Sequence, residues 1–235
     1  MSGMRAHAAA LIAAVLSAGC AGALPPEKET VGWQSLFDGR TTQGWRNVAG
    51  TTLDPRWQVV DGALVLTAPG GGDIVSVGTF ADFELELEWR LAPGGNSGLF
   101  YRAIDAEPVW MRAVEFQLLD DQRAEDRFIA SHRAGAVYDL VVPEGATLRP
   151  ADEYNLARVV ACGARVEHWL NGVRVAAYDL DSDDWRRRVA ASKFAGQADF
   201  AMARRGHIGL QDHGDVVNVR NIRIRVLGAD CAPVH

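Results

Sequence analysis

The sequence predicts an all-β protein, a β-sandwich of two antiparallel sheets with one short helix. Three observations predict this fold. Short segments in which apolar and polar residues alternate recur along the chain, and turn pairs such as Asp61-Gly62 and Asn171-Gly172 separate them. Only Asp183–Ala191 has apolar residues, Trp185 and Val189, at helical spacing. Strands at short intervals with glycine-rich turns and little helix are typical of a sandwich.

The length and composition indicate one folded domain that does not bind nucleic acid. The chain has 235 residues, 48% of them hydrophobic, and sandwiches and barrels of about 200–250 residues occur as single domains. The formal charge is −6, and no basic face compensates for it. The one basic run, Arg186–Arg188, closely follows Asp181, Asp183 and Asp184, which indicates a neutralised surface.

The start of the chain has the features of an export signal. Arg5 supplies a positive charge, and residues 8–16 form an apolar stretch that is too short to span a bilayer. The segment Leu16-Ser17-Ala18-Gly19-Cys20 resembles a bacterial lipobox, with serine where leucine is usual. In such a signal Cys20 is acylated and becomes the first mature residue. Secretion without a lipid is the alternative.

These features divide the chain into four expected segments. We expect a lipoprotein-type signal peptide at 1–19, a tether at 20–31, the sandwich domain at 32–228 and a C-terminal tail at 229–235. Two or more acyl chains would hold the protein on a membrane face. The expected location is therefore periplasmic or on the outer membrane of a bacterium, with contact to the membrane through the N-terminal lipid only.

Alternation gives the strands their expected faces. In Phe83–Leu91 the apolar residues alternate with Glu84, Glu86, Glu88 and Arg90, so the apolar face is expected in the core and the glutamates in solvent. A change of apolar phase predicts a bulge near Arg220-Asn221. The other expected strands are Trp57–Val60, Ala63–Thr67, Leu99–Ile104, Ala113–Leu119, Leu156–Ala161, Arg165–Leu170, Val173–Tyr178, His207–Leu210 and Val217–Leu227.

One of these strands, Ala113–Leu119, offers polar side chains on a single face. Val114, Phe116 and Leu118 alternate with Glu115 and Gln117, and the turn-forming cluster Gly94–Gly98 leads into the strand that carries Arg102. The pattern predicts a groove on a sheet, lined by a carboxylate and an amide beside Arg102. A solvated outer face with a surface ion pair is the alternative.

The cysteines after Cys20 are Cys162 and Cys231. An exported compartment permits a disulfide, but a single pair is not a disulfide framework in a domain of this size. Cys162 precedes Gly163 in an expected hairpin turn, and we interpret it as a small buried thiol. The absence of Cys-x-x-Cys and His-x-x-x-His spacing gives no indication of zinc.

A series of motifs runs from the first expected strand to the last. They are Gly32–Gly39 with Gly44-Trp45, Trp57–Gly62, Glu88–Arg90, Gly95–Gly98 with Tyr101-Arg102, Glu115–Gln117 with Asp120-Asp121, Tyr138-Asp139, His168–Gly172, Ser192–Phe194 and Gly209–Gly214. In this order, over about residues 32–227, they resemble the 3-keto-disaccharide hydrolase domain family, once a domain of unknown function. The resemblance implies a concanavalin A-like jelly-roll fold. Tyr154 departs from it, because family members usually have tryptophan there.

The resemblance also implies a reaction. A ketone at C3 of a glycosyl unit acidifies the C2 hydrogen, so a base can remove that proton while the bridging oxygen leaves C1, and water then adds to the enone. Such a reaction needs a base, groups that hold the enolate oxygen and a proton source for the leaving oxygen. The implied partner is a 3-keto sugar, supplied by an upstream sugar 3-dehydrogenase. No cofactor follows from the sequence with certainty.

The resemblance assigns roles to residues of these types. The candidate catalytic residues are Glu115, His213 and Lys193, and the candidate substrate contacts are Asn96, Arg102, Gln117, Asp120, Gln211 and Trp45. Glu115 is the candidate base, with His213 as the alternative, and Lys193 or His213 would stabilise charge or protonate the leaving group. Asp120 and Asp121 are candidates to orient His213 or to bind a divalent cation such as Ca²⁺.

Two other classes of function remain open at this point. A conventional glycoside hydrolase needs a carboxylate pair, but Glu115 and Asp120 are five residues apart and fall on opposite faces of a regular strand. A carbohydrate-binding module needs only a groove and aromatic side chains. Finding Arg102, Glu115, Lys193 and His213 in one pocket would favour an enzyme, whereas scattering would favour binding alone. Some candidate residues also have a purely structural interpretation: His213 as a turn histidine, Lys193 as a solvated lysine and Trp45 as a core tryptophan.

Overall fold

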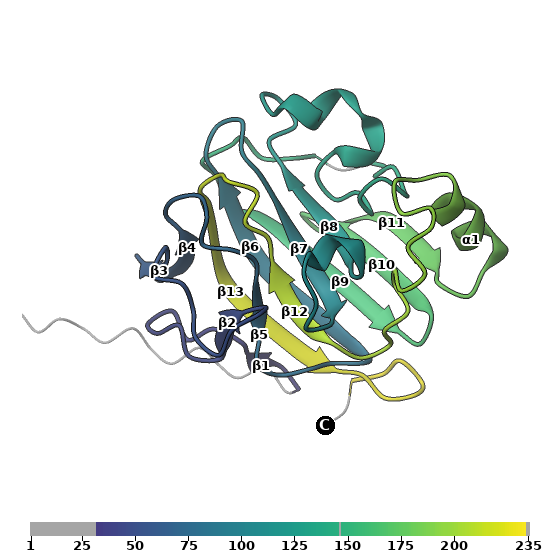
Figure 1. The fold of residues 1–235 in the computed structure, drawn as a ribbon, viewed down its shortest axis with the longest axis horizontal. Coiled ribbons are helices and arrows are strands. Elements are labelled where there is room, and N and C mark those ends of the chain that lie inside the picture. Colours follow the sequence, from purple (N-terminus) through teal and green to yellow (C-terminus); the bar gives the residue numbers. More distant parts are fainter. Residues whose placement is uncertain (1–31, 146, 234–235) are drawn as a thin grey trace, which may run out of the picture.

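The computed structural model describes residues 32–145 and 147–233 (Figure 1). The expected signal peptide, the tether and Cys20 lie outside this range. None of the helices in the described part of the chain is long and apolar enough to cross a membrane.

The chain forms two antiparallel sheets, and the expected all-β sandwich with one α-helix is confirmed. The eight-stranded sheet has the order β11-β10-β9-β6-β13-β4-β3, and β1 pairs with β13; the five-stranded sheet has the order β2-β5-β12-β7-β8 (Figure 1). The eight-stranded sheet contains β1 (Gln34–Ser35), β3 (Trp57–Val60), β4 (Ala63–Leu66), β6 (Phe83–Leu91), β9 (Asn155–Cys162), β10 (Arg165–Leu170), β11 (Val173–Asp179) and β13 (Val217–Val226). The five-stranded sheet contains β2 (Trp45–Asn47), β5 (Ile74–Ser76), β7 (Asn96–Ala103), β8 (Val114–Leu119) and β12 (His207–Leu210).

One apolar core lies between the sheets. Its fully buried side chains include Leu85 and Leu87 from β6 and Phe116 and Leu118 from β8. Because alternate strand residues point to opposite faces, Glu115 and Gln117 of β8 and Glu86 of β6 lie on the outer faces of their sheets. The sandwich therefore has two separate outer faces, one on each sheet.

The turns, the bulge and the helix lie where the sequence predicts them. Asp61-Gly62 and Asn171-Gly172 have positive φ at both residues, 50° and 77°, and 50° and 84°, as two-residue hairpins require. The register of β13 against β6 shifts between Arg220 and Arg223, which confirms the bulge. Helix α1 spans Asp183–Ala190, one residue less than expected, and the Ser182 side chain caps it by accepting from Trp185 N–H.

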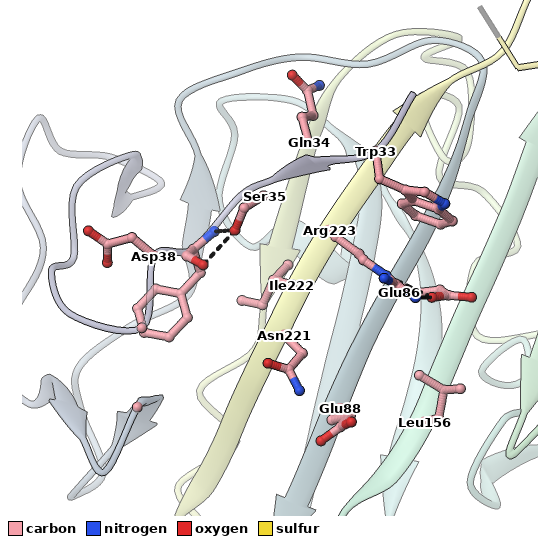
Figure 2. A pocket seen from close by; sticks show the side chains of 13 residues that line it. Trp33, Gln34, Ser35, Asp38, Glu86, Glu88, Leu156, Asn221, Ile222 and Arg223 are labelled. Atoms are coloured by element: carbon pink, nitrogen blue, oxygen red, sulfur yellow. Dashed lines mark hydrogen bonds and ion pairs between the residues drawn. The ribbon is translucent and has the colours of Figure 1, made fainter. Parts of the chain in front are cut away.

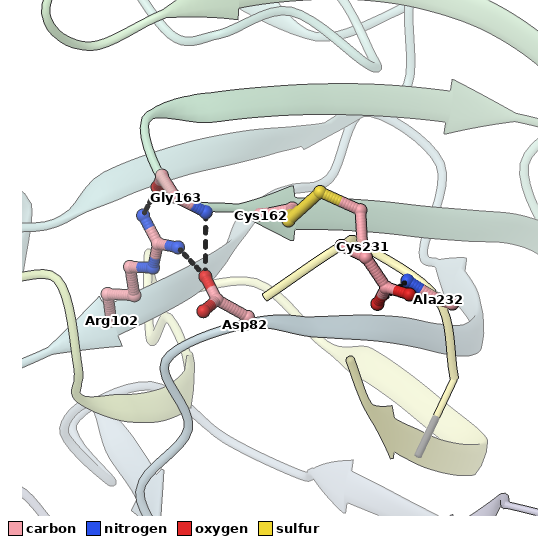
Figure 3. The surroundings of a disulfide bond; sticks show 7 residues. Asp82, Arg102, Cys162, Gly163, Cys231 and Ala232 are labelled. Atoms are coloured by element: carbon pink, nitrogen blue, oxygen red, sulfur yellow. Dashed lines mark hydrogen bonds and ion pairs between the residues drawn. A yellow bond between two sulfur atoms is a disulfide. The ribbon is translucent and has the colours of Figure 1, made fainter. Parts of the chain in front are cut away.

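Two expectations about this part of the fold are wrong. Glu84 is buried rather than solvated, because Arg225 on one neighbouring strand and Arg158 on the other pair with its carboxylate. Cys162 is not a buried thiol: it is partly exposed and forms a disulfide with Cys231, with the two Cα atoms 5.7 Å apart (Figure 3). The bridge joins the end of β9 to the turn that follows β13.

Candidate active site

A polar pocket of about 170 Å³ lies on the outer face of the five-stranded sheet. We call it the amide–glutamate pocket. Its lining consists of Asn96, Trp110, Glu115, Gln117, Tyr138, Lys193, Gln211 and His213. Six of these were nominated from the sequence, and they come from β7, β8, the end of β12 and two loops.

The pairing of neighbouring strands fixes the positions of Glu115, Gln117 and Gln211 in this pocket. Gln117 lies opposite Gly98 on β7, and the backbone N–H of Gln211 donates to the carbonyl of the same Gly98. Both glutamines therefore flank one glycine on neighbouring strands. Glu115 lies two residues before Gln117 on the same face of β8.

Gly98 makes room for the carboxylate. A Cβ atom built on Gly98 would lie 2.3 Å from Glu115 Oε1 and 2.7 Å from its Cδ, closer than atoms can approach. The Glu115 carboxyl group therefore occupies the space that any other residue at position 98 would fill. This explains why the Asn96-Ser97-Gly98 motif ends in glycine.

Burial changes the acidity of Glu115. The residue is 5% exposed, and loss of water raises the pKa of its carboxyl to about 8; nearby Lys193 opposes the rise, while Asp73 and Asp126 add to it. None of the described residues donates a hydrogen bond to this carboxylate. A carboxyl group with such a pKa can take up or release a proton near neutral pH.

Lys193 brings a positive charge to the pocket. Its Nζ lies 4.0 Å from the centroid of the Tyr138 ring and 4.4 Å from that of Trp110, so two aromatic faces hold the ammonium group. The backbone N–H of Lys193 donates to Asp139 Oδ2 at 2.8 Å. Partial burial lowers the pKa of the ammonium, and the charge of Glu115 acts against that.

The amides of the pocket have unused acceptors. Gln117 Nε2 donates to Asn96 Oδ1 at 2.9 Å, while Oε1 of Gln117 and Oε1 of Gln211 are buried without a partner in the described structure. A buried acceptor without a hydrogen bond is costly. Two such oxygens beside a cavity are typical of a site whose hydrogen bonds are completed by a ligand that carries hydroxyl groups.

His213 lies at the exposed rim of the pocket. Asp212 fixes its loop, because the Asp212 carboxylate accepts from the backbone N–H groups of Gly70, Gly72 and Gly214. The ring itself has no hydrogen bond to the described residues. His213 is thus a turn histidine whose side chain is free to meet a ligand.

The prediction that Arg102 lies beside Glu115 is wrong. Arg102 has a φ of 52°, which breaks the strand alternation, and its guanidinium donates to the carbonyls of Ala81 and Gly163 and pairs with Asp82 (Figure 3). The group is almost fully buried there. Arg102 supports the end of the sandwich near the disulfide and does not line the pocket.

Asp120, Asp121 and Trp45 also lie outside the pocket. Asp120 accepts from the backbone N–H groups of Gly94 and Gln122, so it fixes the turn before β7 and neither orients His213 nor contacts a substrate there. Asp121 accepts from Ala134 N–H. Trp45 is buried in the core and donates from its indole to the carbonyl of Leu36. No cluster of His, Cys, Asp or Glu in the described ranges could hold a metal ion.

Tyr138 and Trp110 have no role assigned from the sequence, although both form the aromatic enclosure of Lys193. Tyr138 belongs to a loop that follows β8 and returns along it, with Tyr138 N–H donating to the carbonyl of Glu115. The motif Tyr138-Asp139 was the available signal. Of the four residues whose gathering would favour an enzyme, three meet in the pocket and Arg102 does not.

Comparisons with known proteins show which proteins this chain resembles. A curated relative named 3-keto-disaccharide hydrolase, from Bacteroides thetaiotaomicron, is 32% identical, and the matched region covers 83% of this chain and 79% of the relative. A solved structure of a candidate glycosyl hydrolase from Parabacteroides distasonis has a TM-score of 0.78 at 28% identity, covering 88% of this chain and 99% of that one.

Two further comparisons concern fold and family. A Bacillus subtilis protein with a galectin-like fold has a TM-score of 0.51 at 14% identity, covering 79% of this chain and 92% of the other, which shows the fold alone. The model of the 3-keto-alpha-glucoside-1,2-lyase-like domain matches residues 32–225, most of the chain. The resemblance inferred from the motifs is confirmed, and the chain belongs to the 3-keto-alpha-glucoside-1,2-lyase-like family.

Proposed function

We propose that this protein cleaves the glycosidic bond of 3-keto glycosides, such as 3-keto disaccharides, by elimination followed by addition of water. The observation that carries the proposal is the buried Glu115 carboxyl group, open to a small polar pocket and close to the Lys193 charge. The relative named 3-keto-disaccharide hydrolase supports the substrate class.

In the first step, ionised Glu115 takes the proton from C2 of the keto sugar. The electrons of that C–H bond form the C2–C3 double bond of an enolate, whose oxygen becomes negative. The ammonium group of Lys193, which lines the same pocket, supplies positive charge to stabilise that oxygen. The amide groups of Asn96, Gln117 and Gln211 hold the ring hydroxyls and so fix C2 over the base.

In the second step, the bond between C1 and the bridging oxygen breaks, and the enolate electrons return to give an enone. His213, at the rim, is placed to protonate the departing oxygen. Water then adds its oxygen to C1 and gives a proton back to His213, and protonated Glu115, after its proton has exchanged with water, returns a proton to C2. The sum of these steps is hydrolysis, and Glu115 ends as it began.

A conventional glycosidase is less well supported. Its mechanism uses two carboxyl groups that flank the scissile bond. Glu115 is the one carboxylate among the eight residues that line the described pocket. A binding module is also less well supported, because binding alone gains nothing from holding a destabilising carboxyl group next to a lysine.

Paired substrates test the proposal. The purified domain is offered a disaccharide and the same disaccharide oxidised at C3, and release of the monosaccharides is followed. We expect turnover of the keto form at a rate at least about 10³ times that of the parent, because only the ketone acidifies C2. Equal rates on both sugars would contradict the elimination and favour the conventional glycosidase.

We also propose that the protein is exported and lipidated at Cys20, on the basis of the lipobox-like segment. Its substrate would then come from an enzyme that oxidises the C3 hydroxyl of a glycoside. A Cys20→Ser variant should leave the membrane fraction or remain unprocessed. An intact mass of the native protein without acyl chains would contradict lipidation and leave plain secretion.

A further inference from the structure

A second cavity, of about 700 Å³, lies on the outer face of the eight-stranded sheet (Figure 2). We call it the outer groove. Glu86 and Glu88 of β6 and Arg223 of β13 form its floor, and the segment around β1 forms its wall. Since the amide–glutamate pocket lies on the outer face of the other sheet, the core of the sandwich separates the two sites.

The floor is polar but carries no uncompensated charge. Glu86 pairs with Arg223 at 2.7 Å, and Glu88 pairs with Arg220 at 2.7 Å. Both ion pairs use Oε2 of the glutamate, and no described residue donates to either Oε1. Asp38 also lines the groove, and its carboxylate accepts from the backbone N–H groups of Arg40 and Thr41. The groove therefore offers acceptors for hydroxyl groups.

Two amides add donors and acceptors. Asn221 stands at the bulge of β13 with a φ of 52°, and Figure 2 shows its amide on the groove side, near Ile222 and Glu88. A bulge turns a side chain away from the direction that regular alternation would give it. Asn221 and Gln34 are both exposed, and neither side-chain amide is hydrogen-bonded to the described residues.

An aromatic ring closes one side of the groove. The indole of Trp33 lies over the guanidinium groups of Arg223 and Arg225, with 4.8 and 4.9 Å between each Cζ and the ring centroid. These contacts hold the ring in place, and it stays partly exposed to the groove. A fixed, half-exposed indole suits the apolar face of a sugar ring.

We propose that the outer groove is a second carbohydrate site, which binds a neutral oligosaccharide. A cation would compete with the arginines that pair with Glu86 and Glu88, and an anion would meet these two glutamates and Asp38. An added peptide strand needs a free sheet edge, but the floor lies on β6 and β13 in the middle of the sheet. The site is independent of the proposed reaction, because it needs neither a ketone nor Glu115.

Indole NMR signals test the proposal. The Glu115→Gln variant is titrated with unoxidised maltotetraose, cellotetraose and laminaritetraose, and the Nε1–H signals of Trp33 and Trp110 report the groove and the pocket separately. Trp33→Phe and Trp110→Phe assign these signals. We expect saturable movement of the Trp33 signal with at least one sugar. No movement of that signal with any of the three, or movement of the Trp110 signal alone, would overturn the proposal.

Variants of the groove provide the second readout. Asn221→Gly keeps the positive φ and removes the amide, so it should weaken binding about three- to tenfold, as the loss of one or two hydrogen bonds would. Gln58→Ala changes an exposed residue of the same sheet outside the groove and should leave the affinity unchanged. Equal affinity of the Asn221→Gly variant and its parent would place the sugar elsewhere and overturn the assignment.

Discussion

Two glutamates of the sandwich are equally buried but have opposite surroundings. Glu84, on the eight-stranded sheet, is 4% exposed, and Arg158 and Arg225 pair with its two oxygens. Glu115, on the five-stranded sheet, is 5% exposed, and no described residue donates to its carboxylate. Burial alone therefore does not mark a functional acid. What distinguishes Glu115 is burial without a hydrogen-bonding partner, beside a cavity that a ligand can enter.

The largest expected effect is on activity. Glu115→Gln keeps the shape of the side chain and removes the base, so turnover of a 3-keto disaccharide should fall about 10²–10⁴-fold while binding survives. Glu84→Gln is the matched control, and its activity per folded molecule should be unchanged. Steady-state kinetics with equal loss in both variants would remove the distinction between the two glutamates.

The next effect concerns the space that Glu115 occupies. Gly98→Ala places a methyl group where Glu115 Oε1 lies, so the carboxyl group must move, and a displacement of about 1 Å costs roughly 10²-fold in rate. Gly50→Ala is the control, since its Cβ would meet nothing closer than 3.5 Å. Kinetics would contradict this account if Gly98→Ala kept its full rate.

The Glu115→Gln and Glu84→Gln variants should change the stability of the fold in opposite directions. The pKa of Glu115 is about 8 in the folded chain and near 4.5 when unfolded, so between these values the folded chain binds more protons and stability falls as the pH rises. At pH 7, Glu115→Gln should raise the free energy of unfolding by on the order of 3 kcal/mol.

Glu84→Gln should instead lower the free energy of unfolding, by about 1–3 kcal/mol, since it leaves two partly exposed arginines without their partner. Urea unfolding of both variants at pH 5 and pH 8 measures the difference. The gain from Glu115→Gln should be larger at pH 8 than at pH 5. A loss of stability in both variants would contradict the contrast.

The smallest effect is a shift of the pH profile. If Glu115 is the base, kcat/KM should rise with pH up to about 8, because the ionised fraction rises through the pKa of Glu115. The charge of Lys193 holds that pKa down, so Lys193→Met should move the rising limb to higher pH by about one unit. Lys193→Arg keeps the charge and should leave the limb in place. If kcat/KM instead falls as the pH rises through about 8, Glu115 acts as a general acid and not as the base.

Alternation along the chain predicted the sheets and much of the pocket. It set Glu115 and Gln117 on one face and the apolar residues of β8 in the core, because both are properties of a single strand. It failed at Arg102, where a left-handed residue interrupts the strand, and non-glycine residues rarely take that conformation.

Other features depend on loops and long-range contacts that periodicity does not contain. Tyr138 reaches the pocket on a loop that returns along β8, and Cys231 meets Cys162 across 69 residues of chain. Glu84 was expected in solvent because its partners Arg158 and Arg225 lie on other strands. Cross-strand charge pairing is therefore as important as burial for separating a structural acid from a candidate catalytic one.

The fate of the C2 hydrogen tests the central claim most directly. In heavy water, elimination and hydration should place deuterium at C2 of the released keto sugar, measured by mass spectrometry after correction for the exchange that free keto sugars undergo alone. The Glu115→Gln variant should lose this labelling together with turnover. Cleavage by the native protein with full retention of the C2 hydrogen would contradict proton abstraction by Glu115.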